Sequence, residues 1–178
     1  SLPRELPMTV LQTPRLRLRR LDHADAPFIL RLVNEPSWLQ NIGDKGVRTL
    51  DDALRYLDEG PLAMYARHGF GLYAVTRRED DAPIGLCGLI RRDTLPDADI
   101  GYAYLPEFWG QGFAREAAAA TLEHARRDFG LPRLLAITAP HNTASMRLLE
   151  HLGFALERVE CLGGATQPSH VYALALAP

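Results

Sequence analysis

The most informative segment of this chain is Leu105-Pro106-Glu107-Phe108-Trp109-Gly110-Gln111-Gly112-Phe113-Ala114-Arg115-Glu116. A strand ends at its proline, two glycines follow with one residue between them, and a long helix begins at once. The first amides of a helix have no partner inside it, and glycines let an anion approach the backbone. The stretch therefore predicts a phosphate-binding turn, with an ordinary glycine-rich turn as the alternative.

Two well-known nucleotide-binding loops do not fit this stretch. A dinucleotide fingerprint needs a further glycine where Arg115 stands, and an acidic residue about 20 positions on, after a second parallel strand. A Walker loop needs Gly-Lys-Ser or Gly-Lys-Thr, and neither occurs. The only lysine of the chain, Lys45, stands far from the glycines. Neither of these two folds is therefore expected.

Hydrophobic periodicity predicts strands and helices on both sides of the stretch. Alternating apolar residues indicate strands, and a repeat of 3.6 residues indicates helices. Pro36 is expected to end the first helix, and residues 37–48 are expected to be irregular. The expected strands cover residues 16–21, 70–76, 84–90, 99–105, 134–138, 159–162 and 171–176, and the expected helices cover 25–34, 49–68 with an interruption at Gly60-Pro61, 113–129 and 142–151.

This order of elements predicts an α+β (mixed α/β) fold with about four helices around a largely antiparallel, twisted sheet of about seven strands. One parallel step is expected, because the helix over 113–129 provides a right-handed crossover between two neighbouring strands. The sequence shows no linker and no repeat. We therefore expect a single domain over 1–178, in which residues 1–14 are an N-terminal extension.

Composition excludes several classes of protein. The 20 basic and 22 acidic side chains give a net charge of -2, which argues against a general nucleic-acid or membrane-surface binder. Two cysteines are too few for a disulfide framework, and the six histidines show no metal-binding spacing, so no metal is expected. The sequence has no signal-peptide core and no spanning stretch, and we expect a cytoplasmic protein.

The segment from Trp109 to Ala114 resembles the acyl-CoA pyrophosphate loop of the GNAT superfamily of N-acetyltransferases. The pattern of that loop is Arg or Gln, two residues, Gly, one residue, then Gly or Ala, and Trp109 occupies its first position. Two further segments are similar to the RimJ/RimL-like branch, namely Thr13-Pro14-Arg15-Leu16 and Asn142-Thr143-Ala144-Ser145 followed by Leu152-Gly153-Phe154. The resemblance implies an acetyl-CoA-dependent N-acetyltransferase that moves an acetyl group to a primary amine by direct attack in a ternary complex.

The resemblance also implies where coenzyme A binds. The strands over 99–105 and 134–138 would splay apart, with pantetheine between them and the pyrophosphate on backbone amides at the start of the helix. Arg115 could screen a second phosphate, and Asn142 would both cap its helix and contact pantetheine. The expected coenzyme-binding residues are Ala103, Tyr104, Leu105, Trp109, Gly110, Gln111, Gly112, Phe113, Ala114, Arg115 and Asn142.

Two side chains are candidates for proton transfer. Asp99 is the candidate base, because similar enzymes often carry an acid at this strand position, and the alternative is an aspartate that holds a loop with Asp97. Many family members protonate the leaving thiolate with a tyrosine, but the corresponding position here is Leu149. Ser145 is the candidate substitute, as in RimL-like enzymes, and ordinary solvation in the first helical turn is its alternative.

The sequence leaves the chemical identity of the acceptor open. A RimL-type carboxylate is absent, because Gly164 stands at its position, and the acceptor could be a protein N-terminus or a small amine. A non-catalytic acyl-CoA-binding module is the alternative function, and either a monomer or a homodimer is consistent with the sequence. Aromatic residues that could line the acceptor pocket, or belong to the core instead, are Trp38, Tyr65, Tyr73, Tyr102 and Phe108.

Overall fold

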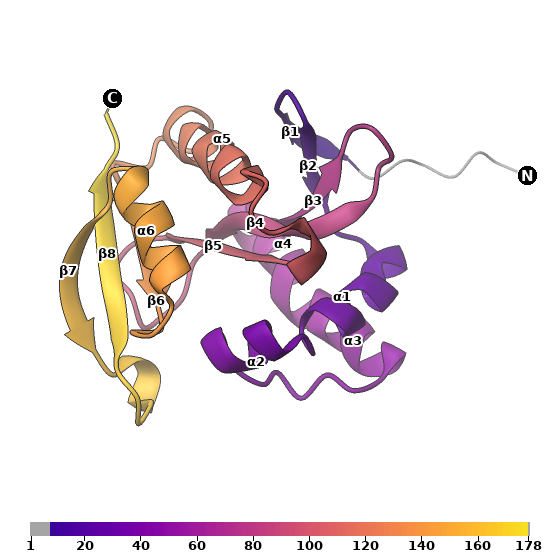
Figure 1. Cartoon of the computed structure of the whole chain (residues 1–178), viewed down its shortest axis with the longest axis horizontal. Coiled ribbons are helices and arrows are strands. Elements are labelled where there is room, and N and C mark those ends of the chain that lie inside the picture. The colour runs from indigo at the N-terminus through magenta and orange to yellow at the C-terminus, as the bar shows by residue number, and fades with distance from the viewer. Residues whose placement is uncertain (1–7, 178) are drawn as a thin grey trace, which may run out of the picture.

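The computed structural model describes residues 8–177, which build one eight-stranded sheet covered by helices on both faces (Figure 1). The expected N-terminal extension lies partly outside this range, at residues 1–7. Its remainder contains an edge strand that the sequence pattern does not predict. The strands are β1 (Thr9–Gln12), β2 (Leu16–Arg20), β3 (Leu72–Arg77), β4 (Pro83–Ile90), β5 (Asp99–Tyr104), β6 (Arg133–Thr138), β7 (Ala155–Glu160) and β8 (Ser169–Ala175).

The sheet has the order β1-β2-β3-β4-β5-β6-β8-β7. Every neighbouring pair is antiparallel except β5 and β6, which confirms the mixed sheet with one parallel step. β5 and β6 pair at a single register position, Asp99 beside Leu135. The two strands therefore diverge beyond this point, toward Tyr104 and Thr138.

The helices are α1 (Ala26–Leu32), α2 (Pro36–Asn41), α3 (Leu50–Leu57), α4 (Ala63–His68), α5 (Phe113–Arg127) and α6 (Thr143–His151). The irregular conformation expected over 37–48 is wrong for its first part, which forms α2. Proline is favoured at the first position of a helix, where its missing N–H costs nothing, so Pro36 begins α2. Gly60-Pro61 lies in a π-helical turn, Asp58–Leu62, that joins α3 to α4.

Each face of the sheet carries its own apolar core. α5 covers one face, where Ala117 and Ala118 are fully buried and let the helix approach the strands closely. α1 and α3 lie on the opposite side (Figure 1), where Leu32 and Leu57 pack with Leu86 of β4. Within residues 8–177, no helix combines the length and the apolar character that crossing a membrane requires.

Candidate active site

The turn between β5 and α5 leaves a row of backbone amides free. Gly110 and Gly112 adopt positive φ angles of 74° and 82°, a conformation that favours glycine. Within the part of the chain that the structure describes, no acceptor receives any of the six amides from Gly110 to Arg115. These donors lie at the positive end of the fifteen-residue helix α5. The turn therefore has the free amides that the expected phosphate-binding site requires, and the phosphate site itself stays a prediction.

A cluster of three side chains, Thr13, Arg15 and Glu116, holds this turn, and we call it the Glu116 clamp. The Glu116 carboxylate accepts hydrogen bonds from Thr13 Oγ1 at 2.5 Å, from the Arg15 amide at 3.0 Å and from Arg15 Nε at 2.8 Å. Arg15 Nη1 donates to the Gln111 carbonyl at 2.9 Å, and its guanidinium lies 4.4 Å from the centre of the Phe113 ring. The Thr-Pro-Arg-Leu segment thus supports the turn between β5 and α5, a contact that the sequence pattern does not predict.

Trp109 connects the loop to the end of β5. Its indole is 53% exposed, and its Nε1 donates to the Tyr104 carbonyl at 2.9 Å. Leu105 follows and faces away from the loop, because its amide donates to the Ile84 carbonyl and its side chain is buried in the core. The side chain of Leu105 is therefore unavailable to a ligand, and a backbone contact between Leu105 and coenzyme A stays a prediction.

A cleft of about 810 Å³ runs from the loop into the space between β5 and β6. This volume lies within the usual range for small-molecule and cofactor sites. Of the expected site residues, Leu105 and Gln111 do not line it. Those that do are Asp99, Ala103, Tyr104, Trp109, Gly110, Gly112, Phe113, Ala114, Arg115, Asn142 and Ser145.

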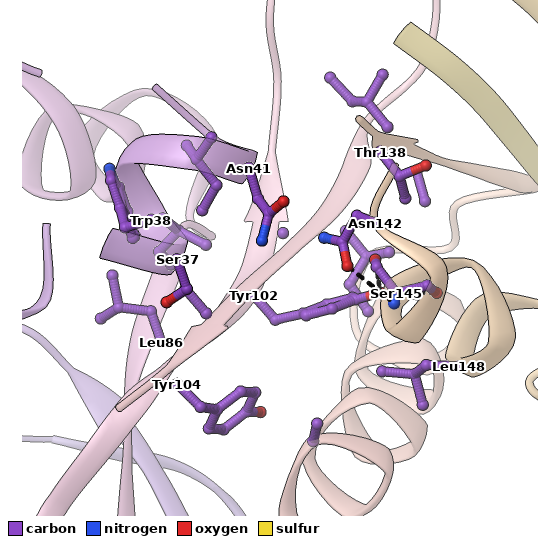
Figure 2. Close-up of a pocket in the computed structure, with 18 of the residues that line it drawn as sticks. Ser37, Trp38, Asn41, Leu86, Tyr102, Tyr104, Thr138, Asn142, Ser145 and Leu148 are labelled. Carbon is purple, nitrogen blue, oxygen red and sulfur yellow. Dashed lines mark hydrogen bonds between the residues drawn. The ribbon is translucent and has the colours of Figure 1, made fainter. Parts of the chain in front are cut away.

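Ser145 meets a tyrosine of β5 inside this cleft. Its Oγ lies 2.7 Å from the Tyr102 hydroxyl, and its amide donates to Asn142 Oδ1 at 3.3 Å, so Asn142 caps α6 as expected. Figure 2 shows Tyr102 reaching from β5 to Ser145 at the start of α6. Burial raises the pKa of Tyr102 to about 12, although the bond to Ser145 acts in the opposite direction. The tyrosine therefore keeps its proton at neutral pH.

Other aromatic and apolar positions divide between the cleft and the core. Trp38, Tyr102 and Phe108 line the cleft, whereas Tyr65 and Tyr73 stack on each other in the core with ring centres 5.7 Å apart. Leu149 is fully buried in the same core and does not line the cleft. No catalytic side chain is therefore offered from that position of α6.

Asp99 lines the cleft at the position where β5 and β6 still pair. Its side chain is 1% exposed, and both carboxylate oxygens accept hydrogen bonds from Arg92, from Nε and from Nη2, each at 2.9 Å. Burial raises the pKa of Asp99, and Arg92 offsets part of this effect. Asp97 pairs with Arg133 instead, at 3.1 Å. Asp99 thus holds the connection between β4 and β5 through Arg92.

The wall opposite α6 comes from the region where the sequence predicted no structure. Ser37, Trp38 and Asn41 of α2 line the cleft, and the following loop adds Lys45. In Figure 2 these α2 side chains lie on the other side of β5 from Asn142 and Ser145. Gly164 does not line the cleft, and the C-terminal hairpin contributes Ser169 there.

The described residues that line the cleft provide backbone amides, hydroxyls, three cationic side chains and a single carboxylate. Across residues 8–177, no group of three or more histidine, cysteine or acidic side chains is arranged to hold a metal ion. Anion binding by amides, followed by proton transfer between oxygen, nitrogen and sulfur atoms, is the chemistry that this arrangement can support.

Comparison with known proteins agrees with this geometry. Residues 15–155 match the family model described as an acetyltransferase (GNAT) domain. The chain is 29% identical over 154 residues to the N-acetyltransferase p20 of Bacillus licheniformis, which covers 84% of each chain.

Solved structures share the fold over nearly the whole chain. The acetyltransferase from Agrobacterium tumefaciens str. C58 superposes with a TM-score of 0.76 at 25% identity, over 96% of this chain and 97% of that chain. The ribosomal L7/L12 α-N-protein acetyltransferase RimL, solved in complex with coenzyme A, has a TM-score of 0.79 at 22% identity, covers 95% and 98% of the two chains, and shows the likeness of the fold alone. The present chain therefore belongs to the GNAT family and is an acetyltransferase.

Proposed function

We propose that this protein is an acetyl-CoA-dependent N-acetyltransferase of the RimJ/RimL-like branch, and that a primary amine attacks the thioester directly in a ternary complex. The observation that carries this proposal is the row of free amides from Gly110 to Arg115 at the mouth of the cleft. The cleft leads from these amides to a hydroxyl pair and a buried carboxylate. Coenzyme and acceptor can thus meet inside one cavity.

The coenzyme is held mainly by the backbone in this proposal. GNAT enzymes use acetyl-CoA, and the free amides of the loop together with Arg115 would bind its diphosphate. The pantetheine arm would follow the diverging strands beside Ala103 and Tyr104. The RimL structure, which shares this fold, contains coenzyme A and supports this assignment.

Ser145 and Tyr102 would act on the leaving thiolate. As the amine nitrogen bonds to the acetyl carbon, the carbon–sulfur bond breaks and negative charge gathers on sulfur. Ser145 Oγ can donate a hydrogen bond to that sulfur while it receives one from the Tyr102 hydroxyl at 2.7 Å. The N-terminus of α6 favours the same charge. We assign the proton donor to this hydroxyl pair.

Asp99 would accept the proton of the attacking amine. An α-amino group has a pKa of about 8 and a lysine side chain about 10.4, so the acceptor is largely protonated at neutral pH. Asp99 is the only carboxylate among the described residues that line the cleft. Its raised pKa makes it a better proton acceptor than an exposed aspartate, and Arg92 fixes its orientation.

The proposal is tested by thiol release from acetyl-CoA with a panel of amines and peptides. Asp99→Asn and Ser145→Ala are expected to lower kcat by about a hundredfold or more while coenzyme A affinity, measured by calorimetry, stays near the wild-type value. Thr143→Ala, in the first turn of α6 but outside the cleft, is the matched control. Coenzyme binding without turnover on any amine would favour the non-catalytic module, and absence of binding heat would contradict the proposal itself.

A further inference from the structure

The cleft is positively charged although the chain as a whole is not. The net charge of the protein is -2, but the charged side chains among the described lining residues are the cations Lys45, Arg92 and Arg115 and the single acid Asp99. A cavity with an excess of cations favours ligands that carry negative charge. Coenzyme A accounts for one such ligand, at the loop.

The cations lie in two places. Arg115 belongs to the coenzyme loop, whereas Arg92 contacts Asp99 at the opposite end of β5. A six-residue strand rises about 17 Å between its ends, so the group that Arg92 and Lys45 face is not the diphosphate. Lys45 lines the same cleft and lies close enough to Arg92 for the charge of Arg92 to act on it.

Both far-end cations keep donors free. Arg92 uses Nε and Nη2 for Asp99, and its Nη1 has no acceptor within residues 8–177. Lys45 makes no ion pair or hydrogen bond with any described side chain. Partial burial and the like charge of Arg92 lower the pKa of Lys45. Arg92 pairs with Asp99 whereas Lys45 has no described ion-pair partner, which leaves the positive charge of Lys45 uncompensated on this side of the cleft.

The positive and negative charges around Asp99 and Arg92 match one simple class of acceptor. An amino acid carries a positively charged amine and a carboxylate on the same carbon atom, and the pair Asp99–Arg92 presents the opposite charges side by side. A polyamine would place further positive charge beside Lys45, and a peptide N-terminus would bring an amide where the carboxylate belongs.

We infer that the acceptor is a free amino acid, whose carboxylate binds Lys45 and the free Nη1 of Arg92 while its amine faces Asp99. This inference rests on the proposed acetyltransferase function and names the substrate class of the same cleft. The two cations are specificity determinants for the acceptor. Lys45 lies on a loop outside the coenzyme site, so its replacement leaves the coenzyme contacts in place.

The test compares matched acceptors on the purified full chain. Thiol release from acetyl-CoA is measured with the standard amino acids, and then with the amide and the decarboxylated amine of the best one. We expect both neutralised counterparts to lose about tenfold or more in kcat/KM, and Lys45→Met to raise the amino-acid KM by about tenfold without changing the KM for acetyl-CoA. Arg67→Met, which removes an exposed charge elsewhere, should change neither constant.

The possible results separate this inference from the proposed function. Equal rates for an amino acid and its amide, or no effect of Lys45→Met, would overturn the inference while acetyl transfer stands. Turnover restricted to peptides with an acidic residue near the N-terminus would also overturn it. Protein that binds coenzyme A but releases no thiol with any acceptor would contradict the proposed function, and the inference would fail with it.

Discussion

Replacing Arg15 with alanine is expected to weaken coenzyme A binding by about thirtyfold without unfolding the protein. Arg15 does not line the cleft, and its side chain is 46% exposed. Its effect comes from the Glu116 clamp, in which it fixes the Gln111 carbonyl and the Phe113 ring. Without it, the loop has to be ordered when the coenzyme binds, so the lost contacts lower the affinity.

The magnitude follows from three contacts. The ion pair with Glu116 is partly exposed and screened, so it contributes about 0.5 kcal/mol. The hydrogen bond to the Gln111 carbonyl is worth about 1 kcal/mol. The cation over the Phe113 ring adds about 0.5 kcal/mol at this exposed position. A total of about 2 kcal/mol corresponds to roughly a thirtyfold change in Kd.

Titration calorimetry with coenzyme A measures this change directly. Arg17→Ala is the matched control, because Arg17 also lies near the start of β2 but forms its ion pair with Asp81 of the β3–β4 turn and does not line the cleft. A Kd for the Arg15 variant within about twofold of wild type, in folded protein, would refute the role assigned to the clamp.

Three further variants test other parts of the site. Gly112→Val should abolish coenzyme binding in calorimetry, because φ is 82° and a Cβ would lie 3.3 Å from Arg15 Nη2; retained binding would contradict the cradle. Burial opposes ionisation of Glu116, but the hydrogen bonds from Thr13 and Arg15 prevail and lower the pKa of Glu116 below the ordinary 4.5. The ionised carboxylate therefore stabilises the fold above pH 4.5, and this stabilisation is lost as the pH falls through the lowered pKa. The free energy of unfolding in urea should therefore differ between wild type and Glu116→Gln at pH 7 and converge in acid, and a constant gap would argue against the ionised clamp. Tyr102→Phe should lower kcat with little change in either KM, and an unchanged kcat would remove the tyrosine from the proton donor.

The sequence predicted the elements whose signals are local. The glycines at 110 and 112 and the alanine-rich helix after them predict the turn between β5 and α5, and α5 itself, without any tertiary information. The sequence does not predict α2, because a proline that ends one helix and a proline that begins the next give the same local signal. Pro36 begins α2. β1 was missed because a four-residue edge strand carries too little alternation to stand out.

The site was predictable only where backbone geometry determines it. The free amides and the cap by Asn142 follow from the positions of helix starts. The pairing of Tyr102 with Ser145 joins residues 43 positions apart across the gap between β5 and β6, and no local pattern predicts it. The same holds for Lys45, which reaches the cleft because α2 turns the following loop toward β5.

Because β5 and β6 pair at a single register position, the two parts of the sheet are joined by few backbone contacts. Beyond Asp99 the facing edges of these strands do not pair with each other, and in the proposed complex the amides of the pantetheine arm would hydrogen-bond to them. The cosubstrate would then bridge the segment β6-β8-β7 to the remainder of the sheet. Binding of the cosubstrate would complete the connection between the two parts of the sheet, and each release of the product coenzyme would remove that connection again.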